Sequence, residues 1–158
     1  MKKILLFSAI LFSFIYLFAQ NKKEVKKNKI KTVTVTETAA GKTLNDEKTV
    51  FDKNGEVIEE TSYTKEGAIK NTHKYKRNKA GDVVEETEYD GKGTLKEKKE
   101  IKYNSLGEKS EEIVYGADLK VQKKHTYSYN KQGLKQDKKT YDGSGKLISV
   151  KSYKYEFQ

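Results

Sequence analysis

Polar and apolar residues alternate along most of the chain after residue 31, in segments rich in Thr, Val, Ile and Tyr. In "AIKNTHKYKR" (68–77), Lys or Thr occupies every second position. A period of two is typical of a β-strand, whose successive side chains point to opposite faces of the sheet. Proline is absent, so every backbone N–H can enter a ladder. The clearest predicted strands are 56–63, 68–77, 82–89, 94–103, 108–115, 120–129, 134–141 and 146–155.

Short polar motifs closed by glycine separate these segments. Asp, Asn or Thr comes first and Gly fourth, as in "DKNG" (52–55) and "NKAG" (78–81). This is typical of a type I turn followed by a left-handed glycine in a β-hairpin. "TAAG" (38–41) and "GADL" (116–119) are weaker copies, and Leu119 stands in the glycine position of the second. The predicted turn glycines are Gly41, Gly55, Gly67, Gly81, Gly93, Gly107, Gly133 and Gly145.

The glycines are spaced alternately by 12 and 14 residues, which defines a repeat of 26 residues containing two strands. Nine turns therefore predict ten strands. A helical alternative is excluded, because a turn every 12–14 residues would leave only short helices without caps. The expected fold is all-β: an antiparallel meander of about ten strands, forming one open twisted sheet or a spiral.

The hairpin loops also predict the register. A five-residue loop places Tyr63 opposite Ile69, and the same register pairs Tyr89 with Leu95, Tyr115 with Val121 and Tyr141 with Leu147. Continued along the strands, this register predicts four polar or oppositely charged pairs: Glu59 with His73, Glu85 with Lys99, Glu111 with His125, and Asp137 with Lys151. It also predicts a tyrosine and aliphatic stripe on one face and a lysine-rich face on the other.

The N-terminus differs from the repeats. Lys2 and Lys3 precede an apolar run that ends at Ala19, which predicts a signal peptide over residues 1–20 and export to the periplasm or cell surface. An uncleaved N-terminal anchor is the alternative. Residues 21–31 form a Lys-rich linker in this interpretation, and residues 32–158 form the repeat domain, with no transmembrane span after cleavage. The absence of Cys excludes disulfides and thiolate metal sites.

Composition limits both the core and the partners. We count 39 apolar residues among the 138 that follow Gln20, too few for a thick two-layer core. The net charge of +10 is concentrated at the N-terminus, since residues 32–158 carry 25 basic and 22 acidic side chains. Arg77 is the only arginine, and arginine is the preferred partner of bases and phosphates. Specific binding to nucleic acid is therefore not expected.

The turn motifs resemble a known family. "YDGSGKL" (141–147), "YDGKGTL" (89–95) and "FDKNGEV" (51–57) are similar to the Y-D-x-x-G motif of YD (RHS) repeats. The resemblance covers about residues 38–157, although the arginine of the family motif is missing. It implies stacked β-hairpins of the kind found in secreted and cell-surface bacterial proteins. It does not imply toxin activity, because no toxin domain accompanies the repeats.

Residues that carry catalytic chemistry are sparse. His73 and His125 are two repeats apart, which places them four strands apart and excludes a shared metal ion. Adjacent glutamates, as in Glu59–Glu60, point to opposite faces of a strand and cannot converge on one bond. The sequence predicts no enzyme, no cofactor and no metal site.

The remaining expectation is a binding or scaffolding role, with an unknown protein or an anionic glycan as partner. One alternative is polyanion binding by the lysine-rich face; another is a role as accessory to a secreted hydrolase or toxin system. The last strand has no following turn, so it is expected to form an exposed edge that can self-associate. The candidate binding face consists of Lys70, Lys74, Lys96, Lys98, Lys120 and Lys124.

Overall fold

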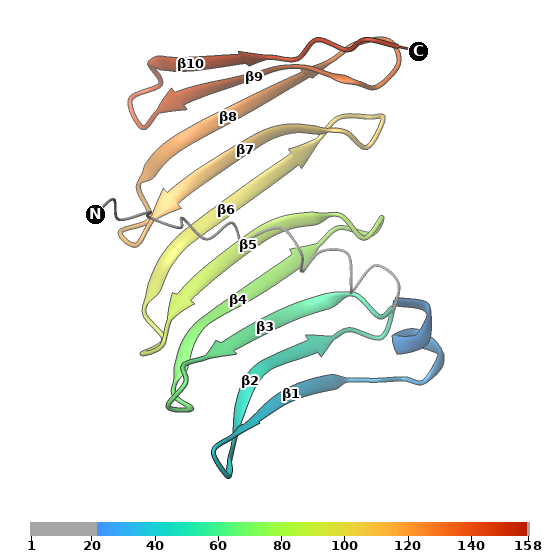
Figure 1. Ribbon diagram of the computed structural model, residues 1–158. Coiled ribbons are helices and arrows are strands. Elements are labelled where there is room, and N and C mark those ends of the chain that lie inside the picture. Colours follow the sequence, from blue (N-terminus) through green and yellow to red (C-terminus); the bar gives the residue numbers. More distant parts are fainter. Residues whose placement is uncertain (1–21, 158) are drawn as a thin grey trace, which may run out of the picture.

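In the computed structural model, residues 22–157 are described, and they form one antiparallel sheet in which every strand pairs with its neighbours in the chain (Figure 1). The predicted ten-stranded meander is therefore confirmed. The strands are β1 (Thr32–Ala39), β2 (Lys42–Phe51), β3 (Val57–Tyr63), β4 (Ile69–Arg77), β5 (Val83–Asp90), β6 (Leu95–Tyr103), β7 (Lys109–Gly116), β8 (Val121–Tyr129), β9 (Lys135–Asp142) and β10 (Leu147–Ser152).

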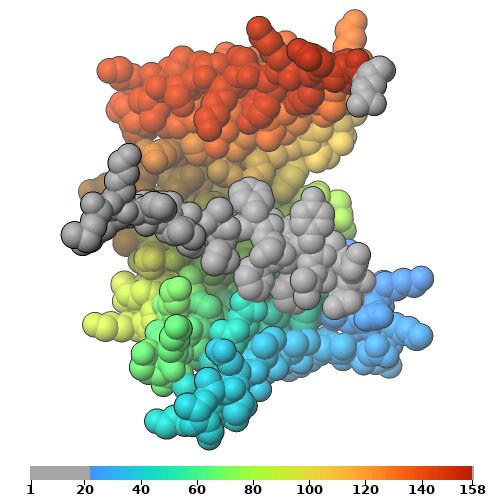
Figure 2. Space-filling view, viewed as in Figure 1, coloured from blue at the N-terminus to red at the C-terminus, as the bar shows by residue number. Residues whose placement is uncertain are grey.

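The sheet is a single open layer and does not close into a barrel. In the space-filling view, the colours pass in chain order from β1 at one end to β10 at the other (Figure 2). No large side chain among the described residues is completely buried, and the best-buried apolar ones are Val25, Phe51, Ile101 and Val114. Stability must therefore come largely from ladder hydrogen bonds, turns and cross-strand side-chain pairs.

The turns have the predicted chemistry. All eight predicted glycines have positive φ, between 76° and 96°. In six turns the Asx Oδ1 accepts two backbone N–H bonds, as in Asp90, which accepts from Lys92 and Thr94 at 2.9 Å each. These bonds rigidify the loop before the glycine returns the chain into the next strand. The other five capping residues are Asp52, Asn78, Asn104, Asn130 and Asp142.

Three turns depart from this pattern. In the β3–β4 turn the hydroxyl of Thr64 takes the place of the Asx side chain and accepts one backbone N–H bond, from Glu66 at 3.2 Å. Leu119 occupies the predicted glycine position, which is therefore confirmed. Its φ of 58° is a strained backbone conformation for a leucine. The first turn is not a copy of the others. Ala39 pairs directly with Lys42, and both Ala40 and Gly41 have positive φ, which makes a two-residue turn of type I′.

Every hairpin contains a β-bulge. The four predicted side-chain pairs, which assumed a regular register, are therefore wrong. Tyr63 lies opposite Ile69 as predicted, but Ser62 lies opposite Asn71, so Lys70 is an extra residue. Beyond the bulge the register is shifted by one: Lys74 faces Glu59, and His73 faces Glu60. The same shift gives Glu85 opposite Glu100, Glu86 opposite Lys99, Glu111 opposite Thr126, Glu112 opposite His125, Asp137 opposite Ser152 and Lys138 opposite Lys151.

The bulges also redistribute the aromatic side chains between the two faces. The ring of Tyr89 lies 5.6 Å from Nζ of Lys74, and the ring of Tyr115 lies 5.8 Å from Nζ of Lys98. These tyrosines therefore lie on the lysine-rich face, and the prediction of separate tyrosine and lysine faces is wrong. A single inserted residue at each hairpin is enough to turn the end of one strand over relative to its partner.

A second repeated contact joins neighbouring hairpins. Tyr103 donates its hydroxyl hydrogen to the carbonyl of Val83 at 2.9 Å, beyond the last paired residues of β5 and β6. This bond satisfies a carbonyl that the splayed ladder leaves free. The same bond recurs every 26 residues, from Arg77 to Val57, Tyr129 to Lys109 and Tyr155 to Lys135. Arg77 thus replaces the tyrosine of the later repeats.

The two ends of the sheet differ from expectation. Residues 22–27 of the predicted linker form a short helix, in which Val25 is buried. Lys22 of this helix pairs with Glu56, and its backbone lies against Gly55 of the β2–β3 turn. At the other end β10 stops at Ser152, short of the predicted 155. The predicted signal peptide lies outside the described residues.

Candidate functional site

We call the face of Lys74, Lys98 and Lys124 the lysine face. Its centre is a row of glutamates that are each held by lysines. Glu85 lies 2.6 Å from Nζ of Lys76 and 3.2 Å from Nζ of Lys98. One repeat later, Glu111 lies 2.8 Å from Nζ of both Lys102 and Lys124. Hydrogen bonding to Lys76 and Lys102 lowers the pKa of Glu85 and Glu111, respectively, so both stay ionised and compensate the lysines.

The structure does not gather the six candidate lysines into one free patch. Lys70 and Lys96 sit at bulge positions, and Lys120 lies in a turn, where it pairs with Asp118. The other pairs are Lys74 with Glu59, Lys96 with Glu88, Lys98 with Glu85 and Glu100, and Lys124 with Glu111. Of these six lysines, only Lys70 has no ion pair with a described residue. Little uncompensated charge remains there for a polyanion.

We call the opposite face the histidine face. Nδ1 of His73 is buried and makes no hydrogen bond of good geometry, although it lies 3.5 Å from Oε1 of Glu86. Contact with Glu86 raises the pKa of His73 against the opposing effect of burial. The same contact lowers the pKa of Glu86, which also lies 3.4 Å from Nζ of Lys99. His73 is therefore stabilised as a cation.

His125 occupies the equivalent position two repeats later but behaves in the opposite way. Its Nδ1 lies 3.0 Å from the hydroxyl of Thr140, and its Nε2 lies 3.9 Å from Glu112. Glu112 is engaged by Lys109 at 2.8 Å. Burial, followed by the nearby charge of Lys138, lowers the pKa of His125. Equivalent positions in the repeat thus favour different protonation states.

This difference predicts opposite pH effects for two matched substitutions, measured by chemical denaturation at about pH 5 and about pH 8. A raised pKa means that His73 stabilises the fold below its unfolded pKa and loses this contribution as pH rises through the folded value. His73→Gln should therefore cost more at about pH 5 than at about pH 8. His125 has a lowered pKa, so its protonation opposes folding at low pH. Relative to the wild type, the free energy of unfolding of His125→Gln should therefore be higher at about pH 5 than at about pH 8. The same sign for both variants would contradict these environments.

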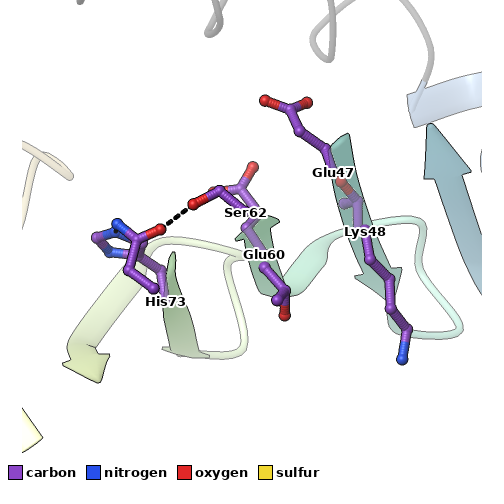
Figure 3. A pocket seen from close by; sticks show the side chains of 8 residues that line it. Glu47, Lys48, Glu60, Ser62 and His73 are labelled. Atoms are coloured by element: carbon purple, nitrogen blue, oxygen red, sulfur yellow. Dashed lines mark hydrogen bonds between the residues drawn. The ribbon is translucent and has the colours of Figure 1, made fainter. Parts of the chain in front are cut away.

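A hollow of about 210 Å³ lies across β2, β3 and β4. Figure 3 shows Glu47 and Lys48 leaving β2 on opposite sides, with Ser62 and His73 on the strands beside it. Ser62 donates a hydrogen bond to Asn71. Burial, then the charges of Asp46 and Glu60, raise the pKa of Glu47. The hollow is thus lined by polar and charged side chains.

The adjacent glutamates diverge as predicted. Glu85 bonds lysines on the lysine face, whereas Glu86 contacts His73 and Lys99 on the histidine face. Within residues 22–157 no group of three or more metal-binding side chains is placed to hold a metal ion. No helix in this part of the chain is long and apolar enough to span a membrane.

One feature that composition alone concealed is the uneven charge along the sheet. Residues 32–119 carry 15 basic and 19 acidic side chains, a net charge of −4. Residues 120–157 carry ten lysines and three acidic residues, a net charge of +7. Because the strands lie in chain order, β8 to β10 form a basic end of the sheet. Summing charge over each repeat would have revealed it.

Comparisons with known proteins do not assign the chain to a family. No family model matches the chain, and no curated protein matches it. A crystal structure of a protein of unknown function from Bacteroides fragilis is similar over 80% of this chain and 96% of that one, with 13% identity and a TM-score of 0.43. TarM matches 82% of this chain and 23% of its own, with 14% identity and a TM-score of 0.34. A TcdB2–TccC3–Cdc42 complex matches 78% of this chain and 9% of its own, with 12% identity and a TM-score of 0.29. The chain is an all-β antiparallel repeat protein.

Proposed function

We propose that the protein is an exported, non-enzymatic scaffold of the periplasm or cell surface, which joins copies of itself through the edges of its sheet. The observation that carries the proposal is the state of the two edges. β1 and β10 each have one neighbouring strand, and all residues of both strands are exposed. An exposed edge offers a row of free backbone N–H and C=O groups to another strand.

The two edge strands correspond to the two strands that meet where one repeat joins the next. Each repeat contributes two strands. Within the sheet, the second strand of one repeat pairs with the first strand of the next, as β8 pairs with β9. β10 is equivalent to β8 but pairs with no following strand within residues 22–157, and β1 is equivalent to β9 but pairs with no preceding strand within the same range. A β10 strand placed beside β1 of a second copy therefore continues the alternation.

Side chains and charge favour the same arrangement. β10 exposes Ile148 (52%) and Val150 (48%), and β1 exposes Val35 (46%). Lys151 is the only charged residue of β10, and Glu37 is the only one of β1. Head-to-tail pairing of this kind is a heterologous contact, which produces open filaments or closed rings. A repeat protein that extends in this way provides a continuous surface for other molecules.

The test is the mass of the purified protein over a range of concentrations, measured by sedimentation velocity. We expect oligomers whose average mass rises with concentration. Ile148→Lys combined with Val150→Lys should shift the protein to monomer, because lysines on an edge oppose strand pairing. Leu106→Lys is the matched control, since Leu106 is 80% exposed in a central turn. A wild-type protein that is monomeric at every concentration would rule out the scaffold, as would equal effects of edge and control variants.

A further inference from the structure

The basic end of the sheet contains a cluster of lysines around one tyrosine on the histidine face. Nζ of Lys135 lies 5.0 Å from the ring centre of Tyr127, and those of Lys138 and Lys109 lie 5.7 Å and 5.9 Å from it. Lys135 also lies 5.7 Å from the ring of Tyr153. Three ammonium groups thus converge on a single aromatic ring. We call Lys109, Tyr127, Lys135, Lys138, Lys151 and Tyr153 the Tyr127 cluster.

Strand pairing explains why these residues meet. Tyr127 of β8 lies opposite Lys138 of β9, which in turn lies opposite Lys151 of β10. All three side chains therefore form a row on one face. From Lys109 on β7 to Lys151 on β10 the row crosses three strand spacings, about 14 Å. A row of this length suits a polymer with repeated anionic groups better than a single small anion.

Carboxylates compensate the cluster only in part. Glu112 lies 2.8 Å from Lys109. Lys135, Lys138 and Lys151 make no ion pair with any residue in the described part of the chain. Burial, followed by the charges of Lys151, Lys109 and Lys135, lowers the pKa of Lys138 against the opposing effect of Glu112. This crowding contrasts with the lysine face, where Glu85 and Glu111 are each shared by two lysines.

We propose that the Tyr127 cluster binds an anionic polysaccharide. The unpaired ammonium groups would contact its carboxylates or sulfates, and the ring of Tyr153, which is 40% exposed, would lie against a sugar ring. Nucleic acid fits less well, because the cluster contains no arginine. Arg77, the only arginine, donates hydrogen bonds to the carbonyls of Val57 and Gly81 in an earlier repeat. The site shares Lys151 with β10, the strand whose edge is used by the proposed scaffold contact, whereas Lys135 and Lys138 lie on β9.

The test is calorimetric titration of the purified protein with polygalacturonate and dextran sulfate, with neutral dextran as the uncharged control. The triple variant Lys135→Gln, Lys138→Gln and Lys151→Gln should weaken binding to the anionic polymers at least about tenfold. The matched control carries Lys53→Gln, Lys79→Gln and Lys92→Gln in exposed turns and has the same net charge. It should retain the wild-type affinity within about twofold, and binding by the wild type should weaken as salt is added.

Further measurements separate the proposal from its alternatives. The cluster variant should unfold at the same or a higher temperature than the wild type, since it loses repulsion between lysines, and a binding defect caused by misfolding would lower that temperature. If both triple variants lost the same amount of binding affinity, net charge alone would explain the effect, and the proposed site would be overturned. Binding to an oligonucleotide or to anionic vesicles, without binding to either acidic polysaccharide, would also overturn it. Concentration-dependent assembly reports on the scaffold separately, so either proposal can fail alone.

Discussion

Gly91→Ala is expected to destabilise the protein by about 2–3 kcal/mol, although Gly91 does not have a positive φ. A Cβ at this position would lie 2.1 Å from the backbone oxygen of Ile69, at the start of β4. Two stretches of backbone would therefore have to separate. The β5–β6 turn packs against the beginning of β4, so this cost falls on the junction between two hairpins.

The matched control is Gly93→Ala in the same turn. Gly93 has φ of +80°, but an added Cβ would meet no atom within 4 Å. Its substitution should cost only the strain of the left-handed conformation, about 1–2 kcal/mol. Gly143→Ala should reproduce the larger effect, because its Cβ would lie 2.2 Å from the oxygen of Val121 two repeats later. Denaturant titration provides all three values, and a Gly93→Ala variant as unstable as Gly91→Ala would contradict the close approach.

Ile101→Ala is expected to cost about 2–4 kcal/mol, which is large for a protein with so little core. Ile101 is 8% exposed and Val114 is 7% exposed. They lie on the histidine face of the central strands β6 and β7, two rungs apart in the ladder. In a single layer, such burial requires the aliphatic stems of neighbouring polar side chains to cover the methyl groups. Truncation leaves a void that the flat sheet fills poorly.

Ile148→Ala provides the comparison at the edge of the sheet. Ile148 is 52% exposed, so its truncation should change the free energy of unfolding by no more than about 0.5 kcal/mol in the monomer. The measurement should be made at low protein concentration, where edge pairing does not contribute. If Ile101→Ala were as mild as Ile148→Ala, the centre of the sheet would contain no apolar core, and ladder bonds and turns alone would account for its stability.

Features that depend on a few neighbouring residues were predictable. The Asx residue, the left-handed glycine and the alternating strand lie close together in the chain, so their pattern indicated the turns and the order of strands. Even the glycine position occupied by Leu119 was recognised, because the 26-residue spacing required it. Gly91 and Gly143 were missed as structural residues. Their role depends on backbone from the preceding hairpin, which the turn motif does not contain.

The candidate site was predicted less well than the fold. The six candidate lysines were chosen for their alternation, but the partners that neutralise them come from neighbouring strands. One bulge per hairpin placed Glu59 opposite Lys74 instead of His73, and it moved Tyr89 onto the lysine face. The basic end was present in the order of residues, yet its convergence on Tyr127 required three strands to lie side by side.

By itself, therefore, the sequence determined the ten strands, their turns, the 26-residue repeat and the open antiparallel order, because each follows from local backbone preference and periodicity. Only the tertiary structure decided which side chains share a face and which charges are compensated. The reason is physical: side chains alternate with a period of two, so one bulged residue exchanges the two faces. That exchange neutralises the expected lysine face and leaves the uncompensated lysines around Tyr127.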